Sequence, residues 1–448
     1  MREIQITADE LVAALLKLSE QKQVCFLDSG GVSHLGSHLL IAGIEPVETL
    51  NISNKNASET LELFNKKLSQ PDSAYIFTIS YDFGLKLENI ESRKKEFPAF
   101  PEPDIFLAAF DCLVVHDYTA GKTYLSGNEK KFYEAEEHLF SRIGSEYSGN
   151  CGNSKTTSNF TRESYISTVE KIQEFIRSGD TYQTNLTQQI RAELPESLTA
   201  QKIFWSLRKS HPAPFAAFLK RDDDFVVSNS PERFVQLKRQ NEKGENKSIS
   251  ASPIKGTRPR GKTEAEDLFL RNELLNSDKD RAENVMIVDL LRSDIGRVCK
   301  FGSVKVEKLC DLETHPTLFH LVSTVSGEFC EDADFADIIK AVFPCGSITG
   351  APKIRTMRII DELETAPRGL SMGAIGYSIQ DSKFQIQNSK SFASFDSSVA
   401  IRTMVICGRE AIFNVGGGIV IDSKPENEYA ESLLKAQALL NAINGRLQ

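Results

Sequence analysis

The chain has 448 residues and carries 62 aspartates and glutamates against 53 lysines and arginines, a formal net charge of −9 that argues against a nucleic-acid partner. With 40% hydrophobic and 26% charged residues, it has the composition of a globular protein with a large core, not that of a disordered or collagen-like chain. No apolar run approaches the roughly 20 residues that cross a bilayer, and the first residues form no apolar signal core, so we expect a cytoplasmic protein without a membrane partner.

The first 150 residues predict a mixture of short strands and helices. Runs of β-branched and aromatic residues indicate strands, and apolar residues at three-and-four spacing indicate helices. These patterns place strands at residues 24–27, 74–79 and 105–116 and helices at residues 8–19 and 59–68. Residues 141–160 are rich in Gly, Ser, Asn and Thr, which is typical of a linker. We therefore divide the chain into an N-terminal region, residues 1–150, and a second domain, residues 157–448.

Longer strands and clearer helices follow the linker. The same patterns place strands at residues 216–219, 225–228, 247–252, 373–379, 398–407 and 411–421 and helices at residues 165–178, 262–276, 279–295, 352–363 and 425–445. The polar stretch 238–246 indicates an exposed hairpin tip between two of the strands. Because strands and helices do not alternate regularly, the pattern indicates an α+β fold and not a doubly wound sheet.

One enzyme class loses support because its motif is absent. The sequence contains no H-E-x-x-H, whereas the patterns G-x-x-x-x-G-K-[ST] and G-x-S-x-G each occur once, at residues 256–263 and 369–373. Its eight cysteines include no C-x-x-C pair, which argues against a zinc knuckle or a disulfide framework.

Two pairs of acidic residues share helix faces. Asp280 and Glu283 lie three residues apart on one expected helix, and Glu428 and Glu431 do so on the last one. Taken alone, such pairs are usually solvated helix surfaces. The alternative is a site for magnesium, which prefers one or two carboxylates together with water and substrate oxygens.

Two further segments can carry chemistry. Lys255 follows a predicted strand in a turn between Pro253 and Gly256, where burial would lower the pKa of its amine and make it a nucleophile. The ordinary alternative is a surface lysine. The triplet 416–418 is three consecutive glycines at the end of a predicted strand, which suits either close approach of a carboxylate or phosphate to bare backbone amides or a simple bulge.

Eight segments match one family in the same order along some 240 residues. They are Gly-Asp-Thr-Tyr-Gln-Thr-Asn-Leu-Thr (179–187), Ser-Pro-Glu-Arg-Phe (230–234), Pro-Ile-Lys-Gly-Thr (253–257), Asp-Arg-Ala-Glu-Asn (280–284), His-Leu-Val-Ser (320–323), Gly-Ser-Ile-Thr-Gly-Ala-Pro-Lys (346–353), Ile-Arg-Thr (401–403) and Gly-Gly-Gly-Ile-Val (416–420). The sequence resembles the chorismate-using enzymes of the anthranilate synthase component I family. This resemblance implies an α+β fold in which large antiparallel sheets form a β-sandwich core with helices packed outside.

Two positions separate the branches of that family. Lys255 stands where anthranilate synthases carry alanine, and Pro-Ile-Lys-Gly-Thr is typical of the aminodeoxychorismate synthases. Gln183 stands where isochorismate and salicylate synthases, which add water, carry a lysine base. The resemblance therefore implies the conversion of chorismate and ammonia to 4-amino-4-deoxychorismate, the precursor of para-aminobenzoate in folate biosynthesis.

The resemblance also assigns roles to the acidic pairs and to the residues that bind substrate. Glu283 and Glu431 resemble direct magnesium ligands, and Asp280 and Glu428 resemble carboxylates that act through water. Arg402 resembles the residue that binds the enolpyruvyl carboxylate. The remaining expected substrate contacts are His320, Ser347, Gly416, Gly417 and Gly418. Ser371 departs from the family pattern, since relatives carry tyrosine or tryptophan there, so the pocket wall is expected to differ.

The implied mechanism uses two catalytic residues. A neutral Lys255 attacks C2 of the ring while a protonated Glu232 donates its proton to the departing 4-hydroxyl. Ammonia then attacks C4 and the lysine is expelled.

The sequence shows no glutamine-hydrolysing nucleophile, so the resemblance implies a separate glutamine amidotransferase subunit, component II, that supplies ammonia. Three alternatives stay open at this point. They are anthranilate synthase component I, a non-enzymatic tryptophan-binding relative suggested by Leu27-Asp-Ser29, and a purely structural protein.

Overall fold

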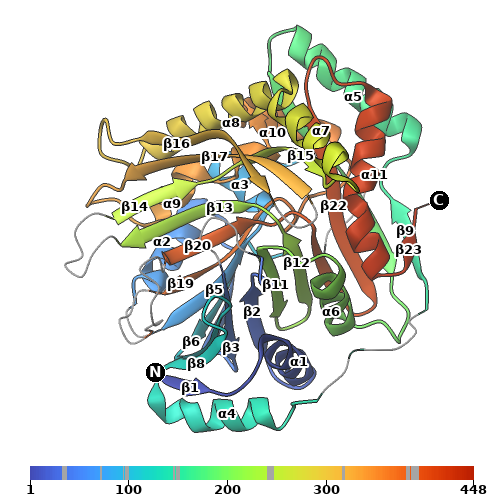
Figure 1. The fold of residues 1–448 in the computed structure, drawn as a ribbon. Coiled ribbons are helices and arrows are strands. Elements are labelled where there is room, and N and C mark those ends of the chain that lie inside the picture. Colours follow the sequence, from blue (N-terminus) through green and yellow to red (C-terminus); the bar gives the residue numbers. More distant parts are fainter. Residues whose placement is uncertain are drawn as a thin grey trace.

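The computed structural model describes the chain except residues 33–37, 71–72, 94, 96–99, 145–146, 148–151, 240–246, 315–317, 380–383, 385–392 and 448. Two large sheets form its centre, and helices cover them (Figure 1). The larger sheet has 13 strands and is antiparallel except where β9 meets β23. Its strands are, in spatial order, β1 (Arg2–Ile4), β8 (Lys122–Gly127), β7 (Cys112–Asp117), β3 (Leu39–Ile44), β2 (Val24–Asp28), β11 (Phe215–Lys220), β12 (Phe225–Ser230), β21 (Thr403–Cys407), β22 (Glu410–Ile419), β10 (Gln183–Glu193), β9 (Ser154–Ser158) and β23 (Gly445–Arg446), with β18 (Gly350–Ala351) beside β10.

The second sheet has 10 antiparallel strands. They are, in spatial order, β15 (Ile254–Pro259), β17 (Leu318–Glu328), β14 (Lys247–Ala251), β13 (Arg233–Arg239), β20 (Ala393–Val399), β19 (Ala374–Ile379), β5 (Ala74–Ile79), β6 (Ile105–Phe110) and β4 (Glu48–Ile52), with β16 (Lys305–Thr314) beside β17. Both sheets contain strands from before and after residue 150, and β2 pairs directly with β11. The N-terminal region and the second domain are therefore joined through the hydrogen bonds of shared sheets.

The two sheets pack face to face. Side chains alternate along β11, so that Ala216 and Phe218 enter the core beneath the helices while Ala217 and Leu219 enter the core between the sheets. The core between the sheets also takes residues from β2, β3 and β7 of the larger sheet and from β5, β6 and β19 of the smaller. This arrangement confirms the predicted α+β fold with a sandwich of large antiparallel sheets.

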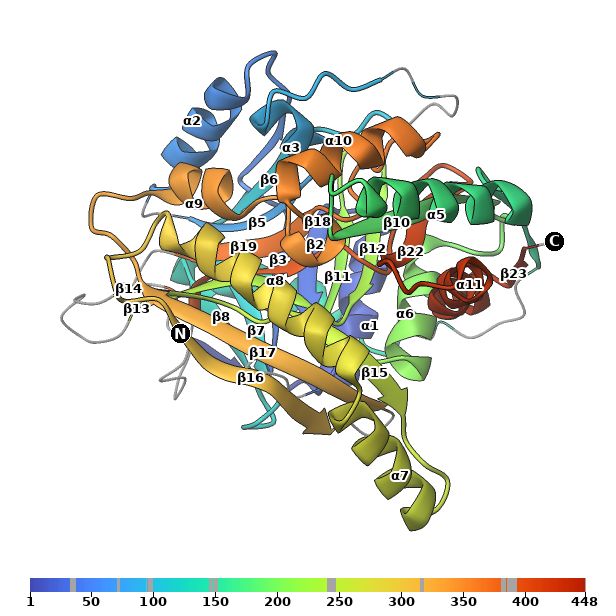
Figure 2. The same cartoon turned by 90° about the horizontal axis from the view of Figure 1, so that it is seen from above.

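Helices cover the outer faces of the sandwich, and Figure 2 shows α8 lying along β16 and β17. The larger sheet packs against α1 (Ala8–Leu18), α4 (Phe132–Phe140), α6 (Ala200–Ser210) and α11 (Pro425–Ala442), and the smaller against α2 (Ala57–Leu68), α3 (Tyr81–Leu87), α8 (Asp278–Gly296) and α9 (Phe335–Val342). The other helices are α5 (Arg162–Arg177), α7 (Glu264–Leu275), α10 (Lys353–Leu363) and the short 3-10 turns η1 (Glu129–Lys131) and η2 (Gly346–Ile348). Among the described residues, no helix is both long and apolar enough to cross a membrane.

Four sequence-based boundaries were wrong. The expected strand 105–116 is divided between β6 and β7, and the expected strand 398–407 is divided between β20 and β21. Part of the expected linker forms β9, because its polar residues pair with β10 and β23 at the edge of the larger sheet. Helix α11 ends at Ala442, and Gly445 opens β23. The expected hairpin tip lies mostly outside the described residues, although β13 and β14 do pair on either side of it.

Candidate active site

The two acidic pairs predicted from the sequence face each other across two helices. Ser277 caps the start of α8 and accepts a hydrogen bond from the backbone of Asp280, and Pro425 begins α11. Lys279 shows how close the helices are, because its Nζ lies 4.0 Å from Glu283 Oε1 on α8 and 3.8 Å from Glu428 Oε1 on α11. The structure thus brings carboxylates from residues 280–283 and 428–431 to one place.

The charges at this place fit a divalent cation. Burial raises the pKa of Glu283, the negative charges of Asp280 and Glu428 raise it further, and nearby lysines oppose the shift. Glu431 is half exposed. Partial desolvation acts to raise its pKa, but Lys435 Nζ, 2.8 Å from its Oε1, lowers the pKa of Glu431 against that effect. Carboxylate oxygens are the ligands that magnesium prefers, and a cation between these groups would relieve the repulsion that burial intensifies. The donor set therefore fits the expected magnesium ion.

Lys255 lies beside this cluster. The sequence indicated that it lies in a turn after a strand, but in the structure it belongs to the next strand, β15. It is the second residue of β15, where an irregularity interrupts the pairing with β17 between Ile254 and Thr257. Such a bulge redirects a side chain out of the regular alternation. Gly256 makes the close approach possible, because its φ is +84° and a Cβ there would lie 2.8 Å from Leu274 and 3.0 Å from Asp280. Lys255 Nζ donates to the carbonyl of Ser347 at 3.4 Å.

Glu232 is buried next to Lys255 with an exposed fraction of 5%. Burial raises the pKa of its carboxyl, although a hydrogen bond from the Ser347 side chain and the charge of Lys255 both act against the shift. Its Oε1 has no hydrogen-bond partner within the described part of the chain. A carboxyl with a raised pKa and a vacant oxygen is suited to hold a proton and donate it to a ligand.

Arg402 sits in the break between β20 and β21 that the sequence did not predict. Its φ of 49° places it in the left-handed region, which explains why the chain cannot continue as one strand. Burial lowers the pKa of its guanidinium, and no acidic side chain of the described residues offsets that effect. A largely buried positive charge without a counter-ion is suited to bind the carboxylate of a ligand.

The glycine triplet lies in the last four residues of β22, near the strand end as predicted, and its three residues do not share one environment. A Cβ at Gly416 would lie 1.9 Å from the carbonyl oxygen of Leu186, and one at Gly418 would lie 2.2 Å from Gln183 Nε2. Gly417 instead faces the acidic helix, with Lys435 Nζ at 3.4 Å and Glu428 Oε2 at 3.5 Å from its virtual Cβ. The glycines therefore allow close packing on both faces of the strand at the edge of the site.

The two remaining predicted contacts flank Lys255. His320 lies on β17 opposite Thr257 and its Nδ1 is 2.9 Å from the Thr257 hydroxyl. Ser347 lies in η2, and its Oγ is 3.3 Å from Cys345 Sγ. Ser371, the position that departs from the family pattern, accepts a hydrogen bond from the backbone of Asn414 on β22 at 3.2 Å.

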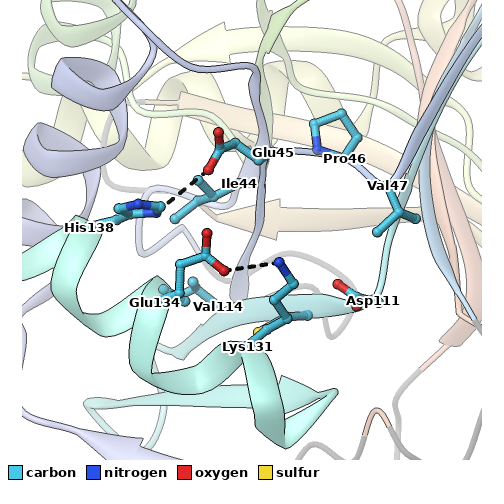
Figure 3. Close-up of a pocket in the computed structure, with 11 residues that line it drawn as sticks. Ile44, Glu45, Pro46, Val47, Asp111, Val114, Lys131, Glu134 and His138 are labelled. Carbon is cyan, nitrogen blue, oxygen red and sulfur yellow. Dashed lines mark hydrogen bonds and ion pairs between the residues drawn. The ribbon is translucent and has the colours of Figure 1, made fainter.

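A separate pocket in the N-terminal region brings Glu45, Glu134 and His138 together (Figure 3). Both glutamates are exposed and each has its own lysine, with Lys22 Nζ 2.6 Å from Glu45 and Lys131 Nζ 2.9 Å from Glu134. Exposed ion pairs of this kind contribute little and commonly occur without any ligand. We therefore take the group between α8, α11 and β15, and not this pocket, as the candidate active site.

Comparison with known proteins identifies the family. A model of the chorismate binding enzymes matches residues 22–441. The chain belongs to this family. It is 37% identical over 377 residues to aminodeoxychorismate synthase component 1 of Bacillus subtilis strain 168, and the match covers 82% of this chain and 76% of the relative. It is 34% identical over 453 residues to aminodeoxychorismate synthase component 1 of Escherichia coli K12, which covers 95% and 94%.

A solved structure agrees with this assignment. The crystal structure of anthranilate synthase component I from Streptococcus pneumoniae TIGR4 matches the fold with a TM-score of 0.74 and 26% identity, covering 91% of this chain and 93% of that one. The chain is therefore an enzyme of the chorismate-binding family, homologous to aminodeoxychorismate synthase component 1. The family resemblance inferred from the motif order is confirmed.

In this chorismate-binding enzyme, sequence reasoning missed two lysines that the structure places at the site. Lys435 Nζ lies 2.8 Å from Glu431 Oε1 and donates to the carbonyl of Gly416 at 3.1 Å. Lys279 spans the gap between the two acidic helices. Both lie four residues from an acidic site residue, Lys435 after Glu431 and Lys279 before Glu283, and that spacing was the signal that could have found them.

Proposed function

We propose that this enzyme aminates chorismate at C4 and forms 4-amino-4-deoxychorismate. The observation that carries the proposal is the position of Lys255, which lies beside the buried Glu232 and within reach of the charge of Glu283. The names of the two bacterial relatives support the same reaction.

Chorismate is a dianion, and the site offers a partner for each carboxylate. Glu283 and Glu431 would bind magnesium directly, Asp280 and Glu428 would bind it through water, and the bound ion would neutralise the ring carboxylate. Arg402 would bind the enolpyruvyl carboxylate with two parallel hydrogen bonds, because its guanidinium has no acidic partner of its own.

The remaining predicted substrate contacts would touch the bound ring. His320 and Ser347 would lie against the ring on either side of Lys255, and the backbone of Gly416, Gly417 and Gly418 would close the wall opposite. Gly416 and Gly418 already pack against Leu186 and Gln183, so the bare face toward the acidic helix is that of Gly417.

The substitution proceeds in two steps. Lys255 attacks C2 through its neutral amine, the ring double bonds shift, and the 4-hydroxyl leaves as water after taking the proton of Glu232. Ammonia then attacks C4, the double bonds shift back, and the C2–N bond to Lys255 breaks. The raised pKa of Glu232 serves the first step, because it keeps the carboxyl protonated at a pH where an ordinary glutamate has lost its proton.

The second candidate function is that of anthranilate synthase component I, and the match to the Streptococcus structure favours it as the alternative. Incubation with chorismate, magnesium and ammonium separates the two, since anthranilate is fluorescent and 4-amino-4-deoxychorismate yields para-aminobenzoate only after a lyase is added. Anthranilate as the product would refute the proposal.

Ammonia requires a supplier, and we propose a separate glutamine amidotransferase subunit. Both bacterial relatives are named component 1 of their synthases, which is consistent with a second component. The isolated chain is expected to turn over chorismate with ammonium but not with glutamine. Glutamine-dependent turnover by the pure chain would show that the partner is unnecessary.

Removal of one metal ligand gives a prediction for magnesium. Glu431→Ala is expected to weaken magnesium binding at least about 100-fold, because loss of a residue that only supports a metal ligand already costs 10- to 100-fold. Calorimetric titration of magnesium and the magnesium dependence of turnover measure the effect. Glu426→Ala is the matched control, since Glu426 lies on the same helix but pairs with Arg162 at the surface. Equal magnesium affinity in the two variants would remove the assignment.

A further inference from the structure

A buried ion pair between Arg368 and Glu364 contacts β10 and the η2 turn, next to predicted site residues. The side chains of Arg368 and Glu364 are 1% and 3% exposed. Nε of the arginine donates to Oε2 of the glutamate at 2.9 Å, and Nη2 donates to Oε1 at 2.7 Å. The guanidinium also lies over the ring of Tyr81, 4.5 Å from its centroid. A guanidinium held in this way by a carboxylate fork and an aromatic face has a single orientation.

The remaining donors of Arg368 reach backbone carbonyls from two distant segments. Nη1 donates to Ile348 at 3.0 Å, and Nη2 donates to Asn185 at 2.7 Å. Ile348 directly follows Ser347 in η2, whereas Asn185 lies on β10 opposite Gly418 of β22. One guanidinium therefore joins the Ser347 turn to the strand that backs the glycine triplet.

Glu364 holds the same strand at a second point. Its Oε1 accepts hydrogen bonds from the backbone N–H of Thr187 at 2.7 Å and from the Thr187 hydroxyl at 2.9 Å. Thr187 lies opposite Gly416 in the pairing of β10 with β22. The ion pair thus contacts β10 at the two residues, Thr187 and Asn185, that pair with the first and last glycines of the triplet.

We propose that Arg368, oriented by Glu364, is a positioning residue that fixes the Ser347 turn and so places the two catalytic groups. The Ser347 carbonyl accepts from Lys255 at 3.4 Å, and its side chain bonds to Glu232. The inference rests on the proposed function because it assigns the effect to these two groups. Lysine at position 368 would keep the charge, but a single ammonium on a flexible stem cannot hold a carboxylate and two carbonyls in one plane.

The test compares Arg368→Lys with Arg221→Lys. Arg221 is a matched control because it is 3% exposed and binds two carboxylates, Glu102 and Asp224, yet none of its described contacts involves a site residue. Both variants are expected to lose stability. Only Arg368→Lys is expected to lower kcat, by about 10- to 100-fold, because displacement of reacting groups by about 1 Å has an effect of that size.

Rates are normalised to folded protein measured by circular dichroism, and chorismate affinity is measured separately by equilibrium dialysis. An Arg368→Lys enzyme with wild-type kcat and affinity would overturn the inference while leaving the proposed function intact. If wild-type protein forms no aminated product, the proposed function fails. Weaker chorismate binding by Arg368→Lys than by Arg221→Lys would then still support the positioning role, and equal binding would refute it. Should Arg368→Lys not fold, Glu364→Gln keeps the side-chain shape and is judged by the same readouts.

Discussion

Lys255→Ala is expected to lower kcat/KM for chorismate amination by roughly 100- to 10,000-fold, the range that a positioned catalytic group contributes. The physical reason is that the variant must displace a poor leaving group directly, without the intermediate that the amine provides. Wild-type protein given chorismate and magnesium without ammonia is expected to gain the mass of chorismate less one water on Lys255. Intact-protein and peptide mass spectrometry measure that gain.

Two controls separate covalent catalysis from a simple loss of charge. Lys262→Ala removes an exposed lysine shortly after β15 and should retain wild-type turnover and adduct formation. Lys255→Arg keeps a positive charge next to Glu232 but offers no neutral amine at working pH. Substantial turnover by Lys255→Arg, or an unmodified Lys255 in active wild-type protein, would contradict the covalent step.

Local patterns predicted those parts of the site that lie on regular elements. The helix expected at 279–295 is α8, Asp278–Gly296, because Ser277 provides a cap and the acidic residues follow in the first turn. Once both helices are placed correctly, the three-residue spacing puts each acidic pair on one face. That the two faces meet depends on packing between residues more than 140 positions apart, and only the resemblance to a family indicated it.

Sequence patterns failed where tertiary contacts decide the backbone. Arg402 lies within a run of β-forming residues, yet the chain breaks between β20 and β21 there, where Arg402 has a left-handed backbone. Residues 154–158 look like linker and form a strand because β10 offers them an edge. Glu364 and Arg368 have the four-residue spacing of an ordinary ion pair, but the backbone carbonyls of Ile348 and Asn185 that Arg368 binds leave no signature in the sequence.

Arg402→Met is expected to weaken function and strengthen the fold at the same time. Loss of the guanidinium should raise KM for chorismate by about 30-fold or more, because removing one side of a buried charge pair costs about 2 to 5 kcal/mol. The ligand-free variant should nevertheless unfold at a higher temperature than wild type, since a largely buried charge without a partner is replaced by an apolar side chain of similar length.

Arg221, which has acidic partners, serves as the control, because its replacement by methionine should lower the stability of the fold. Arg221→Met leaves the carboxylates of Glu102 and Asp224, whose side chains are 8% and 12% exposed, without their partner, and the loss should be about 3 to 5 kcal/mol of stability. Differential scanning calorimetry with and without chorismate measures both the intrinsic stability and the chorismate binding. At the same chorismate concentration, the melting temperature of Arg402→Met should rise less than that of wild type and of Arg221→Met. If Arg402→Met lowers the ligand-free melting temperature as Arg221→Met does, Arg402 is balanced by the fold itself. The proposal that Arg402 lacks a partner until it binds a substrate carboxylate would then be wrong.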